Sequence, residues 1–299
     1  MANRTSVVAS VADAVSLIKD GDVIGIGGFG TTGKPMALIR ELIRSGKKNL
    51  TVVASPASID VDLLISCGMV SKLICAYVGA EAMAPLLPFH SNLVGKSYVI
   101  EEVDLGSFVY MLKARILRLP FLIGRGPVGT SLPQLNPNYR YIEDPFGGPP
   151  VIAIAAVKID VALLHAAQAD KYGNVQHKGA VFLDPLIARA ADKVIVQVEK
   201  LVSNEEIKHS PSETNLPAGL VNTVSVTPYG AHPCASQNYH CVDEAHFKEY
   251  VLAGKAYFKG EEEEFKNYLQ KYVYGVSDHA GYMDAVGFER VMSLGLEEG

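Results

Sequence analysis

Short apolar runs alternate with helical patterns along the first half of the chain. Runs that are apolar on both faces fall at 23–26, 50–54, 72–78 and 98–100. Between them, apolar residues recur with the helical period at 11–19, 35–46, 60–67 and 105–117. Strands that are apolar on both faces are typical of a parallel sheet covered on both sides. The pattern therefore predicts an α/β fold with an open, mostly parallel sheet and helices on both faces.

The second half resumes this rhythm after an interruption. Residues 124–150 are rich in Pro, Gly, Asn and Tyr, and we expect a long loop there. Strand-like runs follow at 151–157, 161–167, 193–199 and 221–227, with a helix at 184–191. Further on, a helix docked on one face is predicted by the apolar spacing of Phe265, Tyr268, Leu269, Tyr272 and Val273. We expect a single domain over 1–299 with a helical C-terminal extension at about 243–290.

Composition and charge narrow the class of protein. Of 299 residues, 48% are hydrophobic, so the chain can bury a sizeable core, and its net charge of −5 argues against a nucleic-acid or membrane partner. Lys158, Asp160 and His165 interrupt the longest apolar stretch, and the N-terminus lacks a secretory signal. The four cysteines, Cys67, Cys75, Cys234 and Cys241, form no C-x-x-C pair, so we expect buried reduced thiols, no metal site and a cytoplasmic protein.

The segment VIGIGGFGTTGKP at 23–35 fits two phosphate-binding patterns. The dinucleotide fingerprint requires an acid at the end of the next strand, but that strand ends in Ala54-Ser55-Pro56 and the first acid is Asp60. The P-loop requires a hydroxyl where Pro35 stands. One alternative is that the glycines serve only close packing of a turn between strand and helix. The other alternative is a binding site for an anion or an oxyanion, because the loop offers backbone N–H groups at the start of a helix.

A longer stretch, DGDVIGIGGFGTTGKP, resembles the A-subunit signature of family I coenzyme A transferases. The matching residues are Asp20, Gly21, Gly27, Gly28, Phe29, Gly33 and Pro35, whereas Gly25 stands where an apolar residue is usual. The likeness continues through LRLPFL, YIEDPF, DVALLHAAQADKYGNV, ADKVIVQVEKLVSNEEI and PYGAHP, and so covers nearly the whole chain. The last three motifs and the Tyr-rich C-terminal helix most resemble the A (alpha) subunit of the glutaconate CoA-transferase branch.

The resemblance implies a two-subunit enzyme that moves CoA between an acyl-CoA and a carboxylic acid, such as a dicarboxylate. In the family the nucleophile toward the thioester is a glutamate of the B (beta) subunit, and an enzyme-bound glutamyl-CoA thioester follows. No S-E-N-G motif occurs here, and we expect surface or capping carboxylates at Glu101, Glu102, Glu199, Glu205 and Glu206. This chain alone should therefore be inactive and should need a B subunit, in a heterotetramer or larger assembly. We expect no tightly bound cofactor, with the CoA thioester as a substrate.

The resemblance also suggests roles for the loop residues. Backbone N–H groups of Gly28, Phe29 and Gly30 would contact the oxyanion or the thioester. Side chains of Thr31, Thr32 and Lys34 would donate to a carboxylate, although Lys34 also suits a solvated helix start. Ser55 and Gly79 follow strands at the edge where open α/β sheets bind ligands.

Other polar residues favour structural roles. His165 and His232 suit hydrogen-bonded structural histidines better than acid–base groups. Asp170, Gly173 and Asn174 read as a tight turn that closes a strand pair.

Two other functions stay open. Relatives of the A/B pair include hydrolases that open a ring of a CoA thioester and decarboxylases of a methylglutaconyl-CoA; the hydrolases commonly carry an acid where Leu105 follows Asp104. A remote alternative is a non-catalytic ligand-binding protein on the same fold, like the sugar-phosphate-binding relatives.

Overall fold

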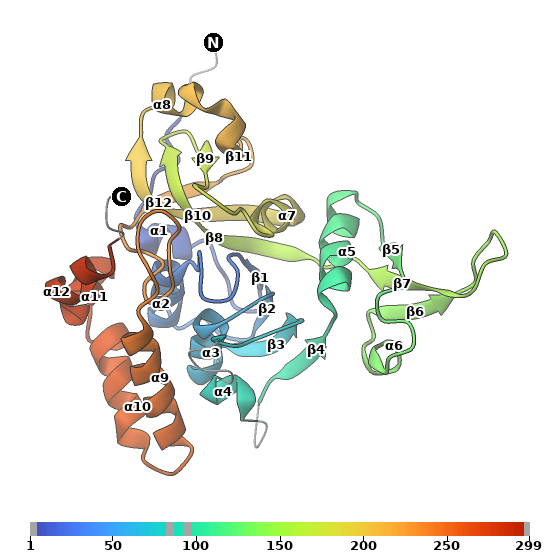
Figure 1. The fold of residues 1–299 in the computed structure, drawn as a ribbon, viewed down its shortest axis with the longest axis horizontal. Coiled ribbons are helices and arrows are strands. Elements are labelled where there is room, and N and C mark those ends of the chain that lie inside the picture. The colour runs from blue at the N-terminus through green and yellow to red at the C-terminus, as the bar shows by residue number, and fades with distance from the viewer. Residues whose placement is uncertain (1–4, 82–86, 93–96, 296–299) are drawn as a thin grey trace.

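A mostly parallel sheet forms the centre of the computed structural model, which describes residues 5–81, 87–92 and 97–295 (Figure 1). Its parallel strands lie in the order β12–β10–β8–β1–β2–β3–β4. Their bounds are β1 Val23–Ile26, β2 Leu50–Ala54, β3 Val70–Cys75, β4 Val99–Glu102, β8 Ile159–Asp170, β10 Ala191–Val202 and β12 Thr223–Val226. Two short strands, β9 (Val175–Gln176) and β11 (Thr214–Leu216), pair antiparallel beyond β8. The predicted open parallel sheet is confirmed.

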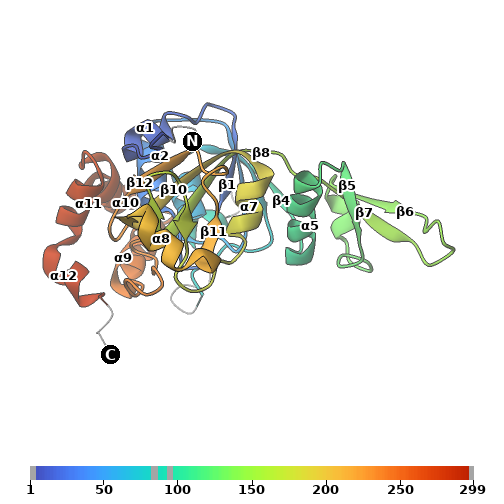
Figure 2. The same ribbon diagram turned by 90° about the horizontal axis from the view of Figure 1, so that it is seen from above.

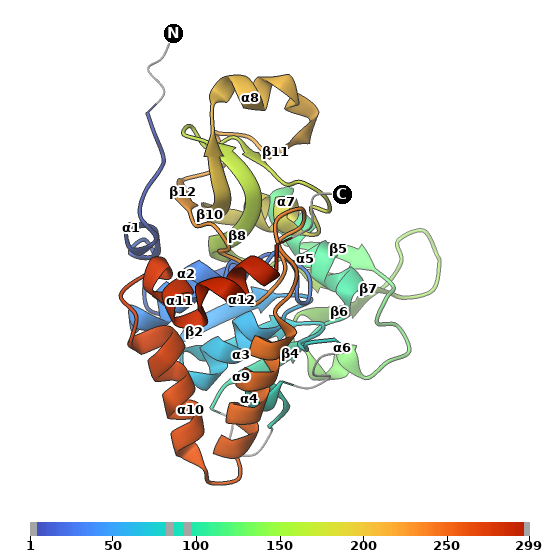
Figure 3. The ribbon, with the colours of Figure 1, turned by 60° about the vertical axis from the view of Figure 1, so that its left-hand side comes forward.

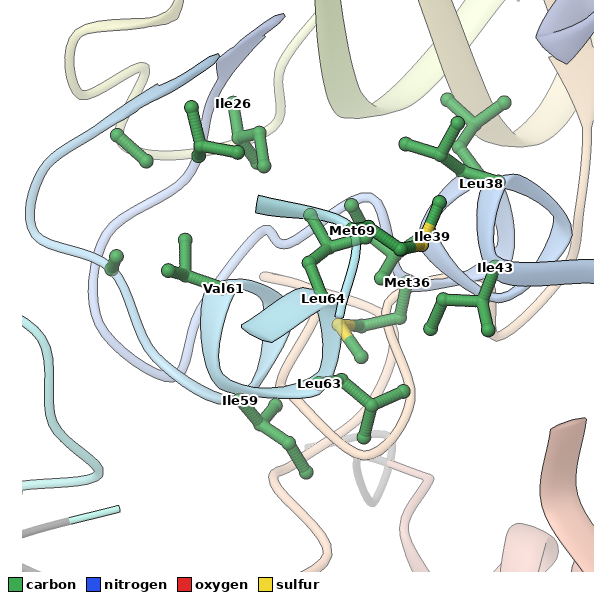
Figure 4. Close-up of a cluster of buried hydrophobic side chains, with 14 of the residues drawn as sticks. Ile26, Met36, Leu38, Ile39, Ile43, Ile59, Val61, Leu63, Leu64 and Met69 are labelled. Atoms are coloured by element: carbon green, nitrogen blue, oxygen red, sulfur yellow. The ribbon is translucent and has the colours of Figure 1, made fainter. Parts of the chain in front are cut away.

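Helices cover both faces of this sheet, and two apolar cores result. The helices along this part of the chain are α1 Val11–Val15, α2 Met36–Arg44, α3 Ile59–Ser66, α4 Pro88–Ser91, α5 Leu105–Ile116, α7 Asp184–Ala190 and α8 Asn204–His209. Successive residues of β2 enter different cores, Val52 the first and Val53 the second, as the alternation of strand side chains requires. Figure 4 shows part of the first core, where Met36 and Ile39 of α2 lie close to Leu64 of α3.

The segment expected to be a long loop contains regular structure. Strands β5 Phe121–Gly124, β6 Tyr139–Ile142 and β7 Val151–Ala155 form a separate antiparallel sheet, and α6 Leu132–Leu135 precedes β6. Figure 2 shows this sheet projecting from one side of the main sheet. The expectation of a loop over 124–150 was wrong at α6 and β6, because four-residue elements are too short to set up a visible period.

The C-terminal extension is helical, as predicted. It comprises α9 Glu244–Tyr257, α10 Glu262–Leu269, a π-helical turn at Gln270–Tyr274, α11 His279–Val286 and α12 Phe288–Ser293. Figure 3 shows α9 and α10 side by side. The residues predicted to face the core, Phe265, Tyr268, Tyr272 and Val273, are buried, and Leu269 is partly buried against them.

The cysteines differ in part from the expectation. All four are free thiols, but only Cys75 and Cys234 are buried, while Cys241 is exposed and Cys67 is intermediate. Within the described residues, no helix is both long enough and apolar enough to cross a membrane.

A buried carboxyl group ties the C-terminal extension to the sheet. Tyr250 of α9 donates a 2.6 Å hydrogen bond from its hydroxyl to Asp62 Oδ2, and the His90 N–H donates to Asp62 Oδ1, also at 2.6 Å. Burial raises the pKa of Asp62 to about 6, although these hydrogen bonds lower it. The folded chain therefore holds this proton more tightly than the unfolded chain does.

This proton makes stability depend on pH. Its contribution is fully present below the unfolded pKa of 3.8 and is lost as the pH rises through about 6. Asp62→Asn keeps the shape of the side chain without the charge, so we expect the variant to lack this loss. At pH 7 its free energy of unfolding should exceed that of the wild type by up to roughly 3 kcal/mol. Urea unfolding between pH 4 and pH 7 measures this difference, and Asp284→Asn, at an exposed position, is the control. Parallel pH curves for Asp62→Asn and the wild type would contradict the assignment.

Candidate active site at the carboxyl edge of the sheet

The glycine loop, residues 27–35, joins β1 to α2 at the edge of the sheet where the parallel strands end. The three amides expected to contact an oxyanion already have partners within the chain. The Gly28 N–H donates to Asp184 Oδ1 at 2.7 Å, the Phe29 N–H to Thr32 O at 2.9 Å, and the Gly30 N–H to Pro56 O at 3.1 Å. The expectation that these three N–H groups are available to an oxyanion therefore disagrees with the structure. The loop closes on itself and on its neighbours instead.

Two glycines of the loop are required by close approach. Gly28 has φ of +78°, and a Cβ there would lie 2.5 Å from the Gly33 carbonyl oxygen. A Cβ at Gly27 would lie 2.6 Å from Asp184 Oδ1. Real Cβ atoms do not approach backbone or carboxylate atoms this closely, so any side chain at these positions displaces the loop or Asp184.

Lys34 lies under the loop and not in solvent. Its side chain is fully buried, and Nζ donates to the carbonyl oxygens of Gly27 at 3.1 Å and Pro56 at 2.9 Å. Nζ also lies 3.3 Å from Oδ2 of buried Asp60, an oxygen with no other hydrogen-bond partner among the described residues. The expected donation from Lys34 to a substrate carboxylate is wrong for this geometry, and so is the solvated alternative. Lys34 joins the ends of β1 and β2 to the start of α3.

Fewer donors remain on the loop than the sequence suggested. The Thr31 N–H and the hydroxyls of Thr31 and Thr32 have no hydrogen-bond partner within the part of the chain that the structure describes. Phe29 is 41% exposed and stacks on Phe182, with ring centroids 5.4 Å apart. Exposed Glu81 places its carboxylate against Gly30, where a Cβ would collide with it. The loop thus presents an aromatic ring, a few neutral donors and one carboxylate.

Ser55 and Gly79 lie at the expected edge but are occupied. Ser55 is buried, and its Oγ accepts a hydrogen bond from the Ala76 N–H at 3.2 Å. The Gly79 N–H donates to the Ala57 carbonyl at 3.0 Å. These contacts connect the ends of β2 and β3, so both residues shape the edge.

A cavity of about 30 Å³ adjoins the glycine loop. Its walls combine residues of the glycine loop, of β8 and of the segments between β8 and α9: Thr32, Gly33, His165, Ala166, Ala167, His177, Lys178, Ala180, Phe182, Asp184, Ser236 and Gln237. His177 Nε2 lies 3.3 Å from Asp184 Oδ2, and its Nδ1 lies 3.2 Å from Asn215 Oδ1. Sequence analysis missed Asp184, His177 and Ser236, which have no motif spacing and come together only through the fold.

His165 is buried in a polar cluster behind this cavity. Its Nε2 lies 2.9 Å from Ser236 Oγ and 3.2 Å from Glu199 Oε1, and its Nδ1 lies 2.9 Å from Gln197 Nε2. Glu199 is 5% exposed, so the expectation of a surface or capping carboxylate was wrong there. Burial raises the pKa of Glu199, but His165 and His240 outweigh it and hold this pKa well below its usual range.

The other polar residues singled out in the sequence form ion pairs or turn hydrogen bonds within the chain. Glu101 pairs with Lys72 at 2.7 Å, and Glu205 pairs with Lys208 at 2.8 Å. The turn after β8 is confirmed, because Asp170 Oδ1 accepts from the N–H groups of Tyr172 and Asn174 while Gly173 has φ of +90°.

His232 belongs to a buried group with Asp243 and His246, whose ligand atoms lie within 4.8 Å of one another, a spacing that also suits a metal ion. However, Arg290 donates to both oxygens of Asp243, at 2.5 and 2.8 Å, and a guanidinium in that place opposes a divalent cation. Burial lowers the pKa of His232 to about 4, although Asp243 raises it, so this histidine is neutral near pH 7.

Comparison with known proteins identifies the family of this architecture. A sequence profile described as "Coenzyme A transferase" matches residues 8–227. The A subunit of glutaconate CoA-transferase from Acidaminococcus fermentans is 30% identical over 98% of this chain and 96% of its own length. The crystal structure of that transferase superposes with a TM-score of 0.91 at 29% identity, covering 98% of this chain and 97% of the other.

Two further proteins are similar to this chain over most of its length. A subunit of the cholesterol ring-cleaving hydrolase IpdA of Rhodococcus jostii is 31% identical over 88% of this chain and 95% of its own length. An uncharacterized protein of Archaeoglobus fulgidus is 37% identical over 96% of this chain, which spans 63% of that protein's length.

The Lys34–Asp60 pair gives a stability prediction. Lys34→Met leaves Asp60 buried without its compensating cation, so we expect a loss of about 3–5 kcal/mol in the free energy of unfolding. Lys34→Met with Asp60→Asn removes both charges and should recover part of this loss. Urea titrations of both variants measure the effect, and Lys48→Met, at an exposed position, should change stability by less than about 0.5 kcal/mol. Equal losses for the single and double variants would refute a compensating pair.

Proposed function

The chain belongs to the coenzyme A transferase family, and on that premise we propose that it is the A subunit of a two-subunit CoA-transferase. The pair would move CoA from an acyl-CoA such as acetyl-CoA to a carboxylic acid, with a dicarboxylate such as glutaconate as the acid. The observation that carries this proposal is the full-length superposition on glutaconate CoA-transferase, with a TM-score of 0.91. The CoA thioester acts as a substrate and no bound cofactor takes part.

The nucleophile is assigned to the partner subunit. Lys34 occupies the interior of the glycine loop, and the carboxylates of Asp60 and Asp184 are buried and already accept hydrogen bonds. Glu81 is the exposed carboxylate at the loop, and the experiment below distinguishes it from a nucleophile on the partner. This chain contributes the rigid loop, with Phe29 and the hydroxyls of Thr31 and Thr32 facing the assembled site. A B subunit then completes it in a heterotetramer or larger assembly.

The test is reconstitution of the two subunits. This chain is co-expressed with the product of its neighbouring gene, and CoA exchange from acetyl-CoA to C4–C6 acids is measured for the pair and for each chain. Borohydride reduction of the acylated pair, followed by peptide mapping, locates any glutamyl-CoA thioester. We expect exchange only from the pair and an adduct only on the partner. Activity of this chain alone, or an adduct on Glu81, would overturn the assignment of the nucleophile.

A second candidate function is hydrolytic opening of a carbon ring in the acyl group of a CoA thioester. It rests on the 31% identity to the ring-cleaving hydrolase subunit, which covers 88% of this chain. Leu105 after Asp104 weakens this candidate, since that hydrolase type commonly carries an acid there. When the reconstituted pair is given a cyclic acyl-CoA, addition of one water to the ring with the CoA thioester retained, and no CoA exchange, would favour this candidate.

A glycine comparison tests the role of the loop. Gly28→Ala drives a methyl group into the Gly33 carbonyl, so we expect at least a tenfold loss of kcat in the reconstituted pair. Gly46 also has positive φ, at +68°, but a Cβ there meets nothing within 4 Å, so Gly46→Ala is a control with the same backbone strain. Circular dichroism and the mass of the pair confirm that both variants fold and assemble. Equal kcat values for the two variants would exclude a catalytic requirement for the loop geometry.

A further inference from the structure

A one-way chain of hydrogen bonds leads from helix α2 to the cavity beside the glycine loop. It begins at the Leu38 N–H, which donates to Gln197 Oε1 at 3.1 Å. A backbone N–H can only donate, so this contact fixes which end of the Gln197 amide is the oxygen. The amide nitrogen of Gln197 therefore faces His165 Nδ1, 2.9 Å away.

This contact sets the proton position on His165. An amide nitrogen has no lone pair to offer, so His165 Nδ1 must accept and carries no proton. The proton of the neutral ring is on Nε2, which lies 2.9 Å from Ser236 Oγ and 3.2 Å from Glu199 Oε1. His165 therefore donates to Ser236 and takes no proton from it.

The direction of this bond decides what Ser236 can do. A serine, a histidine and a carboxylate together suggest a hydrolase triad, in which the histidine nitrogen facing serine must be unprotonated. In this chain that nitrogen holds the proton, so His165 cannot act as a base toward Ser236. Ser236 is 3% exposed, and its hydroxyl proton has no acceptor among the described residues. Since Ser236 lines the cavity, its hydroxyl is a donor directed at whatever the cavity holds.

The cavity suits a small oxygen anion. Its volume of about 30 Å³ exceeds the roughly 10–15 Å³ that one water molecule needs, so it has room for a small polar group. Thr32 adds a second hydroxyl without a partner in the described chain, and Lys178 adds a cation that Glu213 shares. Asp184, the acid in the wall, is turned toward the Gly28 N–H and His177. Ala166, Ala167 and Ala180 leave room beside these donors.

We propose that this cavity is a subsite for the distal carboxylate of a dicarboxylic substrate, with the Ser236 hydroxyl, oriented by Gln197 and His165, as its hydrogen-bond donor. The substrate class rests on the proposed function; the proton position on His165 does not. The subsite selects dicarboxylates over monocarboxylates of the same length, and no covalent step occurs at Ser236.

Kinetics of the reconstituted pair test the selectivity. We expect Ser236→Ala to raise KM for glutaconate about tenfold or more and to change KM for crotonate less than twofold. The matched control is Ser225→Ala. The Ser225 hydroxyl is also buried and has no hydrogen-bond partner among the residues described, and it lies next to Gln197 in the strand register but outside the cavity wall. This variant should leave both constants unchanged. An equal rise for both acids, or no rise for either, would overturn the subsite.

Nuclear magnetic resonance tests the proton position separately. This chain, labelled with ¹⁵N-histidine, is assembled with the unlabelled partner, and long-range ¹H–¹⁵N correlations identify the tautomer of His165. We expect the Nε2–H form, with signals that move when glutaconate, but not crotonate, is added. An Nδ1–H form, or labelling of Ser236 by a fluorophosphonate, would disprove the donor chain. If the pair shows no CoA exchange but His165 still responds to glutaconate alone, the proposed function fails and the subsite stands.

Discussion

The buried ammonium group of Lys34 is the interaction on which the candidate site depends. Three segments converge on it: the end of β1 through the Gly27 carbonyl, the end of β2 through the Pro56 carbonyl, and the start of α3 through Asp60. A buried lysine is tolerated only when its charge and its donors are satisfied, so each contact constrains the others. The strand ends are thereby held at one separation, and the glycine loop is built on that frame.

The same constraint explains the chemistry of the loop. With the interior filled by Lys34 and the amides of Gly28, Phe29 and Gly30 directed at internal acceptors, the loop has little freedom to close on a ligand. What it offers is a fixed surface of aromatic and hydroxyl groups. A preorganised surface contributes to catalysis by positioning, since it needs no rearrangement when the substrate arrives. This suits the proposed role, in which a partner subunit supplies the reacting group.

The fold was predictable from the sequence because its signals are local. Each buried strand is an apolar run, and glycine stands directly after α2, where Gly46 has φ of +68°. The site was less predictable because its contacts are not local. Asp184 lies 156 positions from Gly28, and nothing in the motif indicates that this carboxylate accepts the hydrogen bond of the Gly28 amide. Lys34 reads as an ordinary helix-start lysine until Asp60 and Pro56 are placed beside it. The resemblance directed attention to the glycine loop, while only the fold identifies which of its groups are occupied.

Two histidines on the cavity wall show how such a site is divided between binding and reaction. The His177 ring faces two oxygens, Asp184 Oδ2 and Asn215 Oδ1. The Asn215 atom must be the amide oxygen, because it also accepts a hydrogen bond from the backbone N–H of His177 at 2.9 Å. His165 faces an amide donor on one side and a hydroxyl on the other. Neither ring turns an available lone pair toward the cavity, so neither is placed to remove a proton there. The hydroxyls of Ser236 and Thr32, whose protons have no acceptor among the described residues, therefore suit the proposed binding of an acid and not attack on it.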